Sequence, residues 1–166
     1  MFDFSNLFSG VLGAGLTLCA TFFWRVRDER KQKSTLRASL RMELSTILPE
    51  CKRFSKCLKD YYNTEKKKTA PPLHQNYTTV YDTNAGRVGT LGETTAASVV
   101  LAYTRLKVTI DTASAYLAAC HKYLVTESRG TPRESYYPAV QNLCETLEEQ
   151  MPRTTAAIEE AIRLLS

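Results

Sequence analysis

The residue types that most often do chemistry in proteins are few and scattered in this chain. His74 follows Pro71 and Pro72, and His121 follows Cys120 within a predicted helix. Adjacent helical residues point about 100° apart, so Cys120 and His121 cannot pair as nucleophile and base. The 5 cysteines include no C-x-x-C, and no Cys/His group has metal-ligand spacing. We therefore predict no catalytic residue, no metal site, no cofactor and no enzymatic activity.

Known catalytic and nucleotide-binding patterns are also missing. There is no Gly-rich phosphate loop, no G-x-S-x-G turn, and no arginine five residues before either histidine. The acidic residues near the C-terminus are predicted to form the solvated face of the last helix: Glu145, Glu148, Glu149, Glu159 and Glu160. The sequence therefore favours a binding role over a catalytic one.

The net charge of +5 is concentrated in one segment. Between Arg25 and Lys68 there are 14 basic and 6 acidic residues, whereas from Thr69 to Ser166 there are 8 basic and 10 acidic. Anionic lipid headgroups attract such clusters by about 1 kcal/mol per residue near the surface. The aromatic interleaving of a nucleic-acid interface is poor, so we favour lipid over nucleic acid. The predicted membrane-surface residues are Arg25, Arg27, Arg30, Lys31 and Lys33.

The stretch before this cluster is uncharged from Phe4 to Trp24. A helix of that length spans about 30 Å, the thickness of the hydrocarbon core of a bilayer. Phe22, Phe23 and Trp24 stand where an aromatic belt would lie. The sequence thus predicts a transmembrane helix. Four small residues share one face of it: Ser9, Gly13, Thr17 and Thr21. Two interpretations stay open: this face packs copies of the span into a homo-oligomer, or small residues are simply frequent in single spans.

The basic cluster also predicts the orientation. Short flanking segments rich in Lys and Arg stay in the cytoplasm. We therefore expect a single-pass protein of the inner membrane. Its N-terminus is expected outside and its C-terminal body in the cytoplasm. A cleaved signal peptide is not expected, because the basic n-region is missing and the exit F-F-W is bulky.

Three later segments carry apolar residues at alternating spacings of three and four. They run from Leu40 to Tyr61, from Val99 to Leu124, and from Tyr137 to Leu165. This spacing is typical of coiled coils and bundles. We predict an all-α protein, with the transmembrane helix followed by a three-helix antiparallel bundle. Pro49 and Pro152 are expected to kink or break their helices.

The helical period disappears between the first two of these segments. Tyr77–Tyr81 alternates like a strand, residues 82–86 have turn chemistry, and residues 87–91 could return. A small loop or β-hairpin insertion is predicted there, with Gly86 and Gly89 at positions of positive φ or close backbone approach. The domain boundaries follow: 1–24 span, 25–68 basic juxtamembrane helix, 69–92 loop, and 93–166 the remaining two helices.

The segment Val80–Leu106 carries the pattern V-Y-x-x-N-x-x-x-x-G-x-L followed by V-x-x-x-Y-x-x-L. It resembles a group of small uncharacterised bacterial and prophage membrane proteins that have one N-terminal span. The resemblance covers the middle third of the chain and implies a prophage or phage-defence setting without implying any chemistry. Two interpretations of the loop stay open: its residues pack it onto the bundle, or Tyr81, Asn84 and Arg87 bind a partner.

Two functions follow from these features. The first is a membrane-anchored helical bundle that acts as a protein-interaction or regulatory module with an unidentified protein partner. The alternative is an oligomeric, pore-type effector, which the small-residue face of the span permits. A span without an ionisable residue provides no polar lining for a pore, so the first function is favoured.

Overall fold

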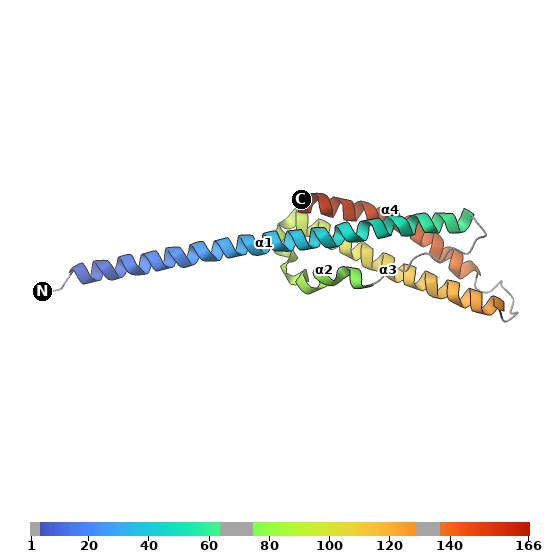
Figure 1. The fold of residues 1–166 in the computed structure, drawn as a ribbon, viewed down its shortest axis with the longest axis horizontal. Helices are drawn as coiled ribbons and strands as arrows, with labels where there is room; N and C mark the ends of the chain where they lie inside the picture. Colours follow the sequence, from blue (N-terminus) through green and yellow to red (C-terminus); the bar gives the residue numbers. More distant parts are fainter. Residues whose placement is uncertain (1–3, 64–74, 129–136) are drawn as a thin grey trace. The chain divides into compact units, whose positions relative to one another are not determined.

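The computed structural model covers residues 4–63, 75–128 and 137–166, with side chains described over 19–58, 77–122 and 138–166. Helix α1 (Phe4–Asn63) is followed by three short helices, η1 (Gln75–Thr78), α2 (Thr79–Asn84) and η2 (Ala85–Leu91). Two long helices complete the chain, α3 (Glu93–Ser128) and α4 (Tyr137–Leu165) (Figure 1). The described part of the chain contains no strand, and the predicted all-α class is confirmed.

The chain divides into two units, Met1–Leu36 and Arg37–Ser166. The first unit is the N-terminal part of α1, whose side chains from Cys19 onward are almost all exposed. Within the ranges that the structure describes, no helix is both long and apolar enough to cross a membrane. Three of the predicted span-packing residues, Ser9, Gly13 and Thr17, lie outside the described side chains, and Thr21 is exposed.

The core of the second unit is built from the three predicted apolar seams. From α1 it takes six fully buried side chains: Leu40, Leu44, Ile47, Cys51, Phe54 and Leu58. From α3 and α4 it takes Val99, Tyr103, Leu106, Ile110 and Ala113, and Cys144, Leu147, Met151, Ile158 and Leu165. Each fully buried large aliphatic or aromatic side chain stabilises the fold by roughly 1.5–3 kcal/mol relative to exposure. The heptad spacing therefore identified these core residues, whereas Ala102, Tyr116 and Ala161 are buried outside the predicted seams.

The helix directions differ from the predicted antiparallel arrangement at one pair. Helices α3 and α4 run antiparallel, and α1 and α3 run parallel (Figure 1). Two hydrogen bonds show the parallel direction. Arg37 bonds to Leu91, just before α3, and Glu43, further along α1, bonds to Tyr103, further along α3. A chain whose two parallel helices are neighbours needs a connection that returns along the bundle. The connection lies between Asn63 and Glu93, and its described part consists of η1, α2 and η2.

A polar pair lies inside the α3–α4 contact. The hydroxyls of Thr109 and Thr154 are 2.9 Å apart and both residues are buried. The Thr109 hydroxyl also donates to the carbonyl oxygen of Arg105, so Thr154 is the donor within the pair. Small side chains flank it, with Ala102 on α3 and Ala157 on α4 fully or almost fully buried. Small residues let the two helices approach closely here.

The predicted β-hairpin is wrong, because the insertion is helical. Side chains in it bond four residues back along the chain: Thr83 donates to the carbonyl of Thr79, and Asn84 to that of Val80. The burial of Val88 and Leu91, three residues apart, requires a helical turn to face both toward the bundle. β-Propensity is a weak preference that tertiary packing overrides. The strand-like alternation of residues 77–81 was therefore misleading.

The prediction for the glycines also needs correction. Gly86 and Gly89 lack positive φ, and a Cβ added at either would meet nothing within 4 Å. The strained position is Gly92, with φ of 97°, directly before α3. Its carbonyl oxygen accepts the first hydrogen bond of that helix, from the amide of Ala96 at 2.8 Å.

The two interior prolines do not end their helices. Pro49 lies inside α1 and Pro152 inside α4, and the helix assignment continues through both. Both prolines are exposed, as are Ser45 and Glu148, whose carbonyls lose their usual partner. Water can reach these carbonyls on the outer face, so the missing hydrogen bonds are tolerated.

Candidate functional site

The most developed polar constellation in the structure joins α1, α2 and α3 around Glu43. This half-buried residue on α1 accepts two backbone hydrogen bonds, from the amide of Val80 at 2.7 Å and from that of Tyr81 at 3.2 Å. These amides belong to the first turn of α2, where backbone donors have no partner within the helix. A carboxylate is favoured there, because the N-terminus of a helix carries partial positive charge. Glu43 thus holds α2 onto α1.

The same carboxylate also binds α3. The hydroxyl of Tyr103, a fully buried residue, donates to Oε2 of Glu43 at 2.5 Å. Burial raises the pKa of Tyr103, and the hydrogen bond with Glu43 raises it further, so the phenol stays protonated and acts as the donor. The ring of Tyr81 stacks on that of Tyr103, with centroids 4.1 Å apart and planes 13° from parallel. One side chain of α1 therefore connects the two other elements.

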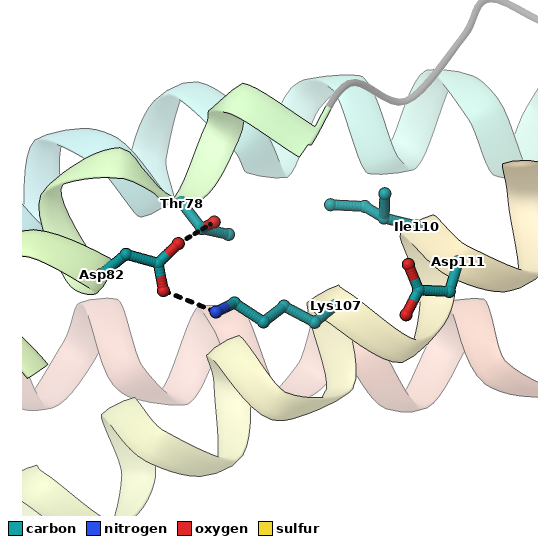
Figure 2. A pocket seen from close by; sticks show the side chains of 5 residues that line it. All are labelled: Thr78, Asp82, Lys107, Ile110 and Asp111. Atoms are coloured by element: carbon teal, nitrogen blue, oxygen red, sulfur yellow. Dashed lines mark hydrogen bonds and ion pairs between the residues drawn. The ribbon is translucent and has the colours of Figure 1, made fainter.

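An ion pair closes the outer side of this constellation. Lys107 on α3 donates to Asp82 on α2 at 2.5 Å, and its ammonium lies 5.6 Å from the centre of the Tyr81 ring. The hydroxyl of Thr78 donates to the other oxygen of Asp82 at 2.8 Å (Figure 2). The hydrogen bond from Lys107, followed by that from Thr78, lowers the pKa of Asp82. Its carboxylate is thus held by both walls of a pocket.

This pocket has a volume of about 350 Å³ and lies between η1–α2 and α3. Thr78 and Asp82 stand on one wall, and Lys107, Ile110 and Asp111 on the other (Figure 2). Among the described residues, Asp111 makes no hydrogen bond and no ion pair, in contrast to Asp82. Two carboxylates and one ammonium leave the pocket with one net negative charge, which favours a cationic ligand.

The three residues predicted to bind a partner differ in their surroundings. Tyr81 is half-buried against Tyr103, and the side-chain amide Nδ2 of Asn84 donates to the carbonyl oxygen of Val80 at 2.9 Å, which closes the turn at the end of α2. Arg87 is exposed on η2. Tyr81 therefore packs the insertion onto α3, and Asn84 bonds within the insertion.

The predicted membrane-surface residues all lie on the exposed surface of α1. These are Arg25, Arg27, Arg30, Lys31 and Lys33. The guanidinium of Arg27 lies 5.5 Å from the centre of the Trp24 ring, and Arg25 forms an ion pair with Glu29 at 3.5 Å. Phe22, Phe23 and Trp24 are 70%, 65% and 64% exposed.

The thiols and histidines form no chemical centre within the described ranges, where no three His, Cys, Asp or Glu residues are arranged to hold a metal ion. Burial raises the pKa of Cys51 to about 11, and burial with nearby carboxylates raises that of Cys144 to about 11. Such thiols carry almost no thiolate at neutral pH. His121 is exposed on α3, and His74 lies outside the described residues.

Comparisons with protein-family models, with curated proteins and with solved structures give no match for this chain.

Sequence reasoning missed four polar residues of this constellation: Glu43, Asp82, Lys107 and Asp111. For Glu43 a signal was present, because it lies three residues after Leu40 and four before Ile47, at the edge of a core seam. An acidic residue there needs a partner when it is buried. Asp82 and Lys107 are 25 residues apart, and no local spacing links them.

Proposed function

We propose that this protein is a single-pass, membrane-anchored helical bundle that acts as a protein-interaction or regulatory module. The uncharged residues 4–24 form the anchor, the N-terminus lies outside, and the bundle lies in the cytoplasm of a bacterial cell. A prophage or phage-defence setting, which the resemblance of residues 80–106 implies, belongs to the same proposal.

The observation that carries the proposal is the exposure of three consecutive aromatic residues on α1. Successive helical residues point about 100° apart, so Phe22, Phe23 and Trp24 together cover an arc of about 200° around the helix. A groove in a partner protein covers only one side of a helix. A membrane interface surrounds it, and aromatic side chains are enriched at that depth.

The residues that follow support an interfacial position. Five exposed basic side chains begin directly after Trp24, and Arg27 covers the face of its ring. Aromatic residues followed by Lys and Arg are typical of the cytoplasmic end of a span. For residues 4–18 the proposal rests on the sequence alone, because the structure describes side chains only from Cys19 onward.

The anchor is tested by fractionating cells that produce the full chain. We expect the protein in the membrane pellet after alkaline carbonate extraction. Replacing Phe22, Phe23 and Trp24 together by serine should move a large share into the soluble fraction. The matched control is Met42→Ser, because Met42 is 72% exposed but lies in the second unit. Recovery of the unaltered chain in the supernatant of a detergent-free lysate would refute the anchor.

The orientation is tested with reporters fused after Ser166. Green fluorescent protein becomes fluorescent in the cytoplasm, and alkaline phosphatase becomes active outside it. We expect fluorescence and no phosphatase activity. Replacing Arg25, Arg27, Arg30, Lys31 and Lys33 by glutamine should reduce this bias. The reverse pattern in the unaltered chain would show that the bundle lies outside.

A further inference from the structure

The outward face of α3 is unusually apolar for an exposed helix. Opposite its buried seam, α3 carries a second series of uncharged side chains at spacings of four, three, four and seven residues: Ala97, Leu101, Thr104, Val108 and Ala115. We call these five residues, together with Val100, the α3 strip. Leu101 is 47% exposed, Val108 49% and Val100 44%. No element described in the structure covers the strip.

Along the central part of the strip, from Leu101 to Ala115, the charged residues of α3 are already engaged, with one exception. On one side Lys107 binds Asp82, and on the other Arg105 donates to the carbonyl oxygen of Arg153 at 3.0 Å. Asp111 remains, one turn beyond Lys107 at the rim of the pocket (Figure 2). It makes no hydrogen bond or ion pair with any described residue. Between Leu101 and Ala115 the strip therefore borders a single uncompensated charge, and that charge is negative. The exposed Glu93, four residues before Ala97, adds a second negative charge at the N-terminal end.

We propose that the α3 strip is the docking surface for one amphipathic helix of a partner protein, and that this helix places a Lys or Arg side chain against Asp111. The proposal rests on the function proposed above and names the partner surface of that module. Heptad spacing selects a helix as the occupant, because a second helix packs against residues repeating every three and four positions. The small residues Ala97 and Ala115 allow its backbone to approach closely.

The pocket next to Asp111 has the size and polarity for the cationic side chain. Its volume of about 350 Å³ exceeds by several times the roughly 30 Å³ that one water molecule occupies in the liquid. Ile110 offers an apolar wall for the methylene stem of a Lys or Arg, and such stems commonly pack on apolar surface. The net negative charge of the pocket attracts the head group.

A second copy of this chain fits the strip less well. In a parallel pair of identical strips, Asp111 of one copy faces Asp111 of the other, and like charges at facing positions destabilise a helix pair. In an antiparallel pair centred on the strip, Asp111 lies opposite the apolar Leu101 and stays without a cation. A partner helix with a cation at that position removes the unpaired charge. Charge complementarity thus favours a different protein, and self-association becomes an outcome that the test must detect.

The test uses the full chain in detergent micelles and a displayed library of helical peptides. The library holds 28-residue peptides with apolar heptads and randomised flanking positions. Selection on the unaltered chain should enrich Lys or Arg at one position, whereas selection on Asp111→Asn should lose that enrichment. A selected peptide should bind Asp111→Asn about fivefold more weakly, the upper range for one surface ion pair. Its own Lys→Gln variant should show no further loss on Asp111→Asn.

Two further variants test the strip itself. Val108→Glu and Leu101→Gln should each abolish peptide binding, and Met42→Ser, at an exposed apolar side chain on α1, should leave it unchanged. Circular dichroism must show unaltered helix content in every variant. Failure to select any binder, or equal binding to Val108→Glu, overturns the proposal.

Sedimentation of the detergent-solubilised chain tests the second copy. A dimer that Val108→Glu dissociates would assign the strip to self-association and overturn the proposal. Carbonate fractionation of the same variants separates this result from failure of the anchor. The strip variants should stay in the membrane pellet, so that loss of binding and loss of anchoring are measured independently.

Discussion

Removing the carboxylate of Glu43 should detach α2 from the bundle and destabilise the second unit. In Glu43→Ala the buried hydroxyl of Tyr103 loses its acceptor, which costs about 1–3 kcal/mol. The amides of Val80 and Tyr81 lose a charged acceptor as well, although water reaches them more easily at the half-buried edge. We therefore expect the free energy of unfolding to fall by about 3–4 kcal/mol in total. That is a large part of the 5–15 kcal/mol typical of a domain.

The size of this effect is checked by urea unfolding of the full chain in mild detergent, followed by circular dichroism at 222 nm. Tyr103→Phe should cost about 1.5–3 kcal/mol, because it removes one hydrogen bond to a charged group. The two substitutions together should cost less than their sum, since both remove the same bond. The control is Glu159→Ala, which breaks an exposed ion pair with Lys52 and should cost less than about 1 kcal/mol.

A second substitution tests the geometry rather than the charge alone. In Glu43→Gln only one oxygen remains, and the new amide NH2 faces donors that it cannot accept from. Glu43→Gln should therefore be nearly as destabilising as Glu43→Ala. Amide hydrogen exchange at Val80 and Tyr81 should accelerate in both variants. Additive costs for the Glu43 and Tyr103 substitutions, or a Glu43→Gln protein as stable as the unaltered chain, would refute the reasoning.

Three further predictions concern the backbone, the buried hydroxyl pair and a thiol. Gly92→Ala should lower the free energy of unfolding by about 1–3 kcal/mol in the same urea assay, because φ of 97° with ψ of 148° is a conformation that glycine alone adopts easily. Gly89→Ala, which meets open space, should be neutral within about 0.5 kcal/mol. Thr154→Val should cost about 1 kcal/mol, and adding Thr109→Val should cost less than a second such step, because the shared hydrogen bond is already gone. Cys51, whose pKa is raised to about 11, carries only about 0.1% thiolate at pH 8. An alkylating reagent should therefore leave Cys51 of the folded chain unmodified until urea is added, as measured by mass spectrometry. Rapid labelling without urea would contradict its burial.

The core of the second unit was predictable because burial follows a local rule. Leu40 to Leu58 repeat every three or four residues, and the structure buries all six seam residues of that range. Near the ends of the bundle the rule weakens. Leu117 and Cys120 are only half-buried, and Tyr116, which the seam omits, is buried instead. Helices that pack against two neighbours at once present a wider face than one seam.

The polar constellation could not be predicted, since its members meet only after the helices have packed. Glu43 and Tyr103 are 60 residues apart, and Asp82 and Lys107 are 25 apart. No spacing rule relates such pairs. The sequence did place one acidic residue, Glu43, at the edge of the apolar seam without a local partner. A carboxylate in that position indicates that a hydrogen-bond donor comes from a distant part of the chain.

The length of the connection between α1 and α3 was the strongest overlooked signal. Helices that are antiparallel neighbours need only about 2–8 residues between them, and here 29 residues separate Asn63 from Glu93. A connection of that length is typical of a crossover between parallel helices. The parallel arrangement is also what makes the constellation possible. Near the start of α3, Arg37 meets Leu91, and six residues further along α1 Glu43 meets Tyr103. In an antiparallel pair the same stretch of α1 would face the far end of α3, and Glu43 would have neither Tyr103 nor the first turn of α2 to bind.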